Sequence, residues 1–279
     1  VSYTHTLTNC RASVKHVLFT DRAFQEIIIF QEIIMMKKSG INSFALHILA
    51  MGFMLCDHLW ATIVPGSWWM TDIGRLAFPI FSFMIVEGFF HTHNRKKYAL
   101  RLLTFALISE IPFNLMYGSS IFYPYHQNVL WTFLLAFGCM AMIETVKKRG
   151  ALWQIIAASV FITLLGSLAG LLLMVDYFHF GVLTVMVFYF FRGHKWYHYA
   201  GQLAGLTYIN AILFAGLEYT VTLSGFTFTF PQQGLAVLAL IPIWLYNGKQ
   251  GPHNKWIQYS FYAFYPVHML ILSLLFRFM

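Results

Sequence analysis

The chain has 279 residues, of which 59% are hydrophobic, 19% are aromatic and only 10% are charged. Soluble domains are about 45–50% apolar and about 25% charged, so this composition excludes a soluble globular protein and predicts an integral membrane protein. The formal net charge of +8 does not indicate a nucleic-acid partner, because the Lys and Arg residues separate long apolar segments instead of lining one face.

The first 36 residues differ in character from the rest. Their basic residues are not followed by an apolar core and a small-residue cleavage site, so no secretory signal peptide is predicted. The pentapeptide Phe24–Ile28 recurs as Phe30–Ile34, which predicts at most an amphipathic helix. We expect residues 1–36 to be an N-terminal extension, read from an upstream start codon or lying at the membrane interface. Residues 37–279 are expected to form the membrane domain.

Nine apolar segments follow in chain order and predict an all-α fold, a polytopic bundle of transmembrane helices. They lie near 43–64, 76–91, 100–117, 128–146, 151–174, 180–192, 197–216, 231–246 and 256–277. Several are shorter than the roughly 20 residues that a straight span needs, which predicts tilted or broken spans.

Basic residues mark alternate ends of these segments. Lys and Arg cluster before the first segment and after the second, fourth, sixth and eighth, whereas the opposite ends carry Arg75 and Arg277. Positively charged loops remain in the cytoplasm. The pattern therefore predicts a cytoplasmic N-terminus and an external C-terminus.

Three acidic residues, Asp57, Glu87 and Glu110, lie within the apolar segments. An ionisable group in hydrocarbon costs roughly 2.5–3.5 kcal/mol on insertion scales, so such residues usually face a polar interior. Glu87 and Glu110 would help to bind a substrate there. Alternatively, they would pair with Arg101 or Arg75 and hold the bundle together.

His58 directly follows Asp57, an arrangement that suits general-base catalysis. Imidazole titrates near neutrality, and a carboxylate can orient the ring and stabilise its cation. Adjacent residues on a helix point about 100° apart, however, so Asp57 would alternatively pair with Arg75 of the next segment. A third interpretation is that the histidines only satisfy hydrogen bonds in the interior.

Further polar residues are predicted to extend this interior site. Arg75 and Asp176 lie near the outer ends of their segments, and His268 lies midway along the last segment with Tyr265 below it. Arg75 or Asn128 would stabilise the oxyanion of a tetrahedral intermediate. These residues are therefore candidates for substrate binding.

A basic mouth is predicted where the cytoplasmic ends of the segments meet. Ammonium and guanidinium groups bind phosphate strongly, and glycine lets the backbone approach a ligand closely. These residues would otherwise serve only as topology signals. The basic mouth comprises Arg95, Lys96, Lys97, Arg101, Asn247, Gly248, Lys249 and Lys255.

The three cysteines, Cys10, Cys56 and Cys139, are isolated and show no CxxC or zinc spacing. Cys56 and Cys139 lie within predicted spans, where a small apolar side chain fits the interior. Neither a disulfide nor a metal site is predicted.

Several motifs recur in the order of a known family. They are Met54–His58 (MLCDH), Arg75–Gly88 (RLAFPIFSFMIVEG), Lys97–Phe113 (KYALRLLTFALISEIPF), Asn128–Thr132, Asp176–Gly181, Tyr246–Gly251 (YNGKQG) and Phe261–His268 (FYAFYPVH). Through these motifs the chain resembles the TraX family. That family is placed in a superfamily with the acyltransferase-3 enzymes and heparan-alpha-glucosaminide N-acetyltransferase. The resemblance covers about residues 40–270, is weak over 193–230 and does not reach residues 1–35.

The resemblance implies N-acetylation of F-pilin, the activity for which the family is named, with acetyl-CoA as the donor. Relatives in the superfamily carry an acetyl group from cytoplasmic CoA to an acceptor across the membrane. It also implies a multi-pass protein of the bacterial cytoplasmic membrane. The acceptor stays open among a pilin-like peptide, a glycan and a small molecule, as does the choice between direct transfer and an acetyl-His58 intermediate.

Two other functions compete with acetyl transfer. A proton-coupled transporter would use Asp57, Glu87, Glu110 and His268 as a relay, although such proteins often contain two related halves and no internal repeat is evident here. A non-catalytic assembly factor would leave the inward-facing histidines and carboxylates without a role. We therefore predict an acetyl-CoA-dependent membrane acyltransferase with no metal and no nucleic-acid partner.

Overall fold

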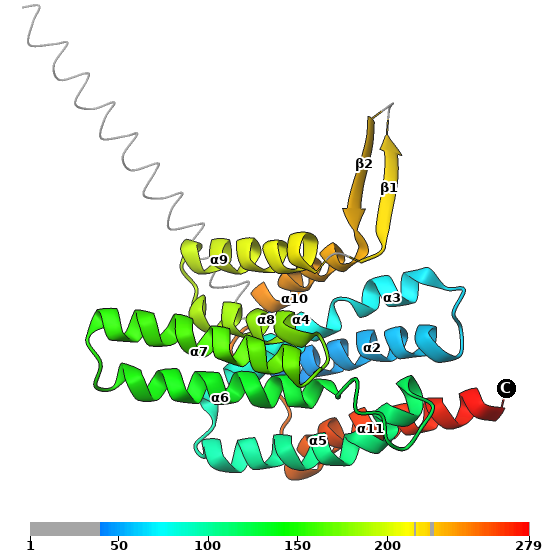
Figure 1. Cartoon of the computed structure of the whole chain (residues 1–279), viewed down its shortest axis with the longest axis horizontal. Coiled ribbons are helices and arrows are strands. Elements are labelled where there is room, and N and C mark those ends of the chain that lie inside the picture. The colour runs from blue at the N-terminus through cyan, green and yellow to red at the C-terminus, as the bar shows by residue number, and fades with distance from the viewer. Residues whose placement is uncertain (1–39, 215, 224–225, 279) are drawn as a thin grey trace, which may run out of the picture.

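The computed structural model describes residues 40–214, 216–223 and 226–278. The predicted N-terminal extension, residues 1–36, lies outside these ranges. Within them the chain forms a bundle of helices that run back and forth between two ends, with one β-hairpin projecting beside the bundle (Figure 1).

The helices agree closely with the predicted apolar segments, each of which contains a helix near its expected position. They are α2 (Ser43–Thr62), α3 (Trp68–Gly74), α4 (Ala77–His91), α5 (Arg95–Tyr117), α6 (Val129–Lys147), α7 (Leu152–Leu172), α8 (Phe178–Phe190), α9 (Trp196–Thr207), the π-helix η1 (Tyr208–Leu213), the 3₁₀-helix η2 (Gln232–Ala239), α10 (Leu240–Trp244) and α11 (Lys255–Phe278).

Six helical segments of the described chain are long and apolar enough to cross a membrane. They are α2, Trp68–His91 (α3 with α4), α5, α6, α7 and α11. The shorter apolar helices Phe178–Phe190 and Gln232–Trp244 lie among them. The chain is thus a multi-helix membrane protein.

Asparagine side chains define where three of the long helices begin. Asn42, Asn94 and Asn128 each precede a helix and accept a hydrogen bond from a backbone amide of its first turn. This capping satisfies one of the free amides at a helix N-terminus, typically worth about 1 kcal/mol. Pro112 and Pro266 lie inside α5 and α11, and both helices continue through them.

The α3–α4 segment lies at the centre of the bundle. Of its apolar stretch 56% is buried, against at most 39% in the other five long segments. Phe89 of α4 is fully buried and meets Phe137 of α6 edge-on, with ring centroids 5.0 Å apart.

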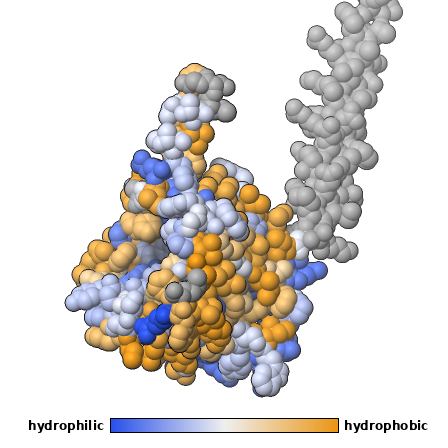
Figure 2. Space-filling view, turned by 90° about the vertical axis from the view of Figure 1, so that its right-hand side faces the viewer, coloured by the Kyte–Doolittle hydropathy of each residue, from blue (hydrophilic) through white to orange (hydrophobic). Residues whose placement is uncertain are grey.

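Helix α7, by contrast, exposes large apolar side chains such as Trp153 and Leu164, and hydrophobic residues cover much of the face seen in Figure 2. Exposed apolar surface of this kind suits contact with lipid.

Two features were not predicted from the sequence. Strands β1 (Glu218–Leu223) and β2 (Phe226–Pro231) pair antiparallel and form a hairpin that stands away from the body of the molecule (Figure 2). The predicted segment 197–216 is also not one regular helix, because α9 passes into the π-helix η1. The all-α prediction therefore holds for the bundle but not for residues 218–231.

Candidate functional site

The centre of the site is a pair of buried histidines on two helices far apart in the sequence. His58 of α2 and His268 of α11 are 7% and 6% exposed, respectively. Their rings stack at an interplanar angle of 7°, and Nδ1 of His58 lies 2.7 Å from Nε2 of His268. This distance is that of a strong hydrogen bond.

The hydrogen bonds of the pair determine its neutral tautomers. Nδ1 of His268 lies 2.6 Å from the carbonyl oxygen of Phe264, which can only accept, so Nδ1 of His268 carries a proton. Nε2 of neutral His268 is then an acceptor, and Nδ1–H of His58 donates to it. Nε2 of His58 is left with a lone pair, the state that a general base requires.

A cavity of about 390 Å³, called the central cavity below, extends along α2 from Ser43 at the start of the helix to Met54. Met54 and Tyr265 belong to its lining. Met54 precedes His58 by four residues, and Tyr265 precedes His268 by three. One helical turn rises about 5.4 Å, so the histidine pair lies about one turn beyond this end of the central cavity.

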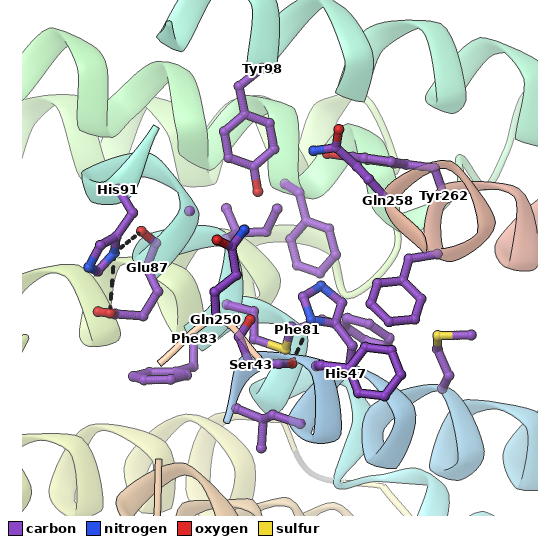
Figure 3. A pocket seen from close by; sticks show the side chains of 18 of the residues that line it. Ser43, His47, Phe81, Phe83, Glu87, His91, Tyr98, Gln250, Gln258 and Tyr262 are labelled. Atoms are coloured by element: carbon purple, nitrogen blue, oxygen red, sulfur yellow. Dashed lines mark hydrogen bonds and ion pairs between the residues drawn. The ribbon is translucent and has the colours of Figure 1, made fainter. Parts of the chain in front are cut away.

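Polar groups from several helices line the same cavity (Figure 3). The hydroxyl of Tyr98 and the amides of Gln250 and Gln258 point into it. His47 lies there too; its Nδ1 is 2.8 Å from the carbonyl oxygen of Ser43, and its ring stacks on Phe261. His47 was not among the predicted site residues. The sequence did contain a signal for it: His47 lies eleven residues, or about three helical turns, before His58 and therefore on the same face of the helix.

Arg101, a predicted residue of the basic mouth, also lines the central cavity. Its guanidinium lies over the rings of Tyr98 and Tyr262, at 5.4 and 6.0 Å from their centroids. Among the described residues, the buried Nε of Arg101 has no hydrogen-bond partner, and no carboxylate forms a salt bridge with Arg101. The cavity therefore contains a positive group available to an anionic ligand.

The other residues of the basic mouth differ in their relation to the cavity. Gly248 lines it with φ of +76°, a backbone conformation that favours glycine, and has open space where a side chain would project. Arg95 instead packs on the ring of Phe89 and donates a hydrogen bond from Nε to the carbonyl oxygen of the same residue. The remaining members do not line the cavity: Lys96, Lys97, Asn247, Lys249 and Lys255.

Asp57 does not contact His58; it pairs with Arg75, as the alternative interpretation predicted. Nη2 of Arg75 lies 2.8 Å from Oδ1 of Asp57, and Thr71 donates to the same oxygen at 2.7 Å. Arg75 also donates to Gln233 of η2 at 3.3 Å. The prediction that Asp57 orients the imidazole was wrong, because the two side chains point in different directions from α2. His268 takes that place.

Glu87 and Glu110 have partners other than the predicted arginines. Glu87 accepts from Arg192 at 2.6 Å and lies 3.6 Å from His91. Oε2 of Glu110 accepts from Asn128 at 2.5 Å and from Trp131 at 2.9 Å. The pairing of these carboxylates with Arg101 or Arg75 was therefore wrong.

Asn128 is fully engaged by these contacts. Its amide donates to the carbonyl oxygen of Ala106 as well as to Glu110, and its Oδ1 caps Leu130. Both amide protons are thus already used, and none remains for an oxyanion. Arg75, which interacts electrostatically with His58, remains the candidate for that role.

Asp176 lies in the turn before α8, and its partner was missed from the sequence. Its Oδ1 lies 3.2 Å from Nε2 of His126, which belongs to the loop between α5 and α6. Tyr177 and Phe178, the next residues, have φ of +61° and +47°. Such conformations cost of order 1–3 kcal/mol for non-glycine residues and tend to gather at functional sites. The only sequence signal for this contact was that His126 and Asp176 both lie in connections that the predicted topology places on the outer side.

Among the described residues, no group of three or more His, Cys, Asp or Glu side chains is arranged to hold a metal ion. The fold and site define a helical, multi-pass membrane protein with a buried histidine pair about one helical turn beyond a cavity that apolar and several polar side chains line. Comparison with known proteins assigns it more narrowly. The chain belongs to the TraX protein family, whose model matches residues 43–276.

One curated relative is a probable fimbrial assembly protein, FimC of serogroup H1, from Dichelobacter nodosus. It is 27% identical over 251 residues, which cover 85% of this chain and 97% of the relative. No solved structure matches the chain.

Proposed function

We propose that this protein is a membrane acetyltransferase that carries an acetyl group from cytoplasmic acetyl-CoA to an amine or hydroxyl group of an external acceptor. One observation carries the proposal: a buried histidine pair with a free Nε2 lies about one helical turn beyond a cavity lined by Arg101, whose guanidinium has no carboxylate partner among the described residues.

In the proposed reaction His58 acts as the general base. Nε2 of His58 removes the proton of the attacking amine or hydroxyl as the new bond to the acetyl carbon forms. The carbon–sulfur bond then breaks, and the same nitrogen returns the proton to the thiolate of CoA. His268 orients the ring through its hydrogen bond to Nδ1 and stabilises the transient cation. Arg75 is the proposed oxyanion partner.

The donor is proposed to enter through the basic mouth. Arg101 would bind a phosphate or pyrophosphate group by charge-assisted hydrogen bonds, and the exposed lysines would attract it from solution. The narrow arm of acetyl-CoA would then extend through the central cavity toward Tyr265 and Met54. This arrangement brings the thioester toward the histidine pair while the charged part of CoA remains in the mouth.

The proposed topology has nine membrane crossings, a cytoplasmic N-terminus and an external C-terminus, in the bacterial cytoplasmic membrane. The basic connections after α4, α6 and α8 lie at the left end of the bundle in Figure 1. The α2–α3 loop, the hairpin and the C-terminus lie toward the opposite end. Positively charged connections at one end support this orientation.

The acceptor is proposed to be a pilin-like peptide, with a glycan or a small molecule as alternatives. Two facts support this order: the family to which the chain belongs is associated with pilin acetylation, and the relative from Dichelobacter nodosus is named for fimbrial assembly.

The experiment is transfer of radiolabelled acetyl from acetyl-CoA by purified protein in proteoliposomes, with a panel of peptides, amino sugars and small amines as acceptors. Wild-type protein should label at least one acceptor. His58→Ala should reduce the rate by roughly 10²–10⁴ while acetyl-CoA binding, measured by equilibrium dialysis, persists. His93→Ala, an exposed histidine, is the control. Proton flux without consumption of acetyl-CoA would instead support a transporter.

A further inference from the structure

A histidine–carboxylate pair, His126 with Asp176, lies near His58, with the ring of Tyr117 next to both histidines. His126 and Asp176 are joined at 3.2 Å, and their side chains are 28% and 27% exposed. The carboxylate can only accept, so Nε2 of His126 carries the proton and Nδ1 of the neutral ring has the lone pair. The pair is thus a partly accessible base with a defined orientation.

Two loops hold this pair in position. Backbone amides of Gln127 and Asp176 donate across the loops, to Met174 and Gln127 respectively, at 2.9 and 2.8 Å. The amide of Tyr177 donates to Oδ1 of Asp176 at 3.1 Å. The ring of His126 meets Phe113 edge-on at 5.0 Å and lies parallel to Phe178 at 6.1 Å. These contacts fix the imidazole against the ends of α5 and α8.

Tyr117 connects the two histidine sites. Its ring lies edge-on to His58, with centroids 6.3 Å apart, and 5.8 Å from the ring of His126. Tyr117 is 42% exposed, whereas His58 is buried. An acceptor that approaches Tyr117 from outside would therefore meet His126 before His58.

The charges around His126 support a role as a proton acceptor. Burial lowers the pKa of His126, but the hydrogen bond and charge of Asp176 and the charge of Glu110 outweigh it, so the pKa is raised. Tyr117, a further titratable neighbour, contacts the ring edge-on. A base on this side is useful because an alkyl amine, with a pKa of about 10.4, is almost wholly protonated at neutral pH and is then not a nucleophile.

We propose that His126, oriented by Asp176, is the acceptor-side base, which deprotonates an acceptor that arrives as an ammonium ion. This inference rests on the proposed acetyl transfer. Nδ1 of His126 takes one proton from the ammonium, which leaves a neutral amine and an imidazolium, and the imidazolium releases that proton to the external solution. The amine then attacks the thioester, and His58 passes the second proton to the CoA thiolate. One proton is released outside for each acetyl group transferred.

The test uses two probes of the same shape, ethylamine and methoxyamine, with labelled acetyl-CoA and a protein-free blank. Ethylamine is protonated at pH 7, whereas methoxyamine is neutral and needs no first deprotonation. His126→Asn should lower the rate with ethylamine roughly 10²-fold and leave the rate with methoxyamine within about twofold of wild type. Raising the pH to 9 increases neutral ethylamine about a hundredfold and should close the gap.

Two further variants complete the experiment. Asp176→Asn should show the same selective loss in weaker form, because Nε2 of His126 loses its charged partner. His179→Asn is the matched control, since its ring contacts Phe180. Equal losses with both probes, no loss with ethylamine, or a wild-type protein that uses only methoxyamine would overturn the inference. No acetyl transfer by wild-type protein to any acceptor would instead refute the proposed function itself.

Discussion

Nδ1 of His58 and Nε2 of His268 lie 2.7 Å apart although 210 residues separate them in the chain. The contact joins α2 to α11 and leaves Nε2 of His58 as the free nitrogen. The bond therefore links the packing of the first and last long helices to the protonation state of the proposed base.

This relationship predicts how His268 variants behave. His268→Phe keeps an aromatic ring but removes the acceptor, so acetyl transfer should fall about tenfold to a hundredfold, less than in His58→Ala. His268→Gln restores an acceptor oxygen and should recover part of the rate. Steady-state kinetics should assign the loss to kcat, with the KM for acetyl-CoA unchanged. Wild-type turnover by His268→Phe would contradict a positioning role.

Gly74 is expected to be intolerant of a side chain. A Cβ there would lie 2.4 Å from Cβ of Asp57, so Gly74→Ala should displace the Asp57–Arg75 pair and lower the free energy of unfolding by about 1–3 kcal/mol. Gly52→Ala in α2 is the matched control, because nothing lies within 4 Å of its Cβ. There, the helix should be unchanged or gain about 0.5–1 kcal/mol. Thermal unfolding in detergent measures both, and equal stability of the two variants would contradict the packing.

Arg101 is expected to matter more for donor binding than the exposed lysines of the basic mouth. Loss of a hydrogen bond to a charged group costs about 1.5–3 kcal/mol, so Arg101→Gln should raise the KM for acetyl-CoA at least about tenfold. Lys96→Gln should have a smaller effect that disappears at high salt, because exposed charges are screened. An unchanged KM in both variants would contradict donor binding and would indicate that these residues serve only as topology signals.

The orientation of the bundle predicts which loops are accessible from outside. In a cysteine-free background, Ser119→Cys in the α5–α6 loop should react with a membrane-impermeant maleimide in intact cells. Gly150→Cys in the α6–α7 loop should react only after the cells are permeabilised. The reverse labelling pattern would invert the proposed topology and move the basic mouth to the external side.

The positions of the helices were evident from the sequence. Within a membrane the backbone must satisfy its own hydrogen bonds, so apolar runs between basic loops have little alternative to helix. Asn42, Asn94 and Asn128 mark helix starts by a local interaction that needs no tertiary contact. The hairpin at residues 218–231 was not apparent, because a short exposed pair of strands leaves no apolar run of membrane-spanning length.

The sequence alone also determined that Asp57, His58, Arg75 and His268 belong to a polar interior, because ionisable groups are too costly in lipid. Only the tertiary structure decided which of these residues contact one another. Neighbours on a helix point about 100° apart, and the choice of helix–helix contacts in lipid depends on side-chain shape and interhelical hydrogen bonds rather than on hydrophobicity. That is why Asp57 faces Arg75 on the next segment, while His58 meets His268 from the far end of the chain.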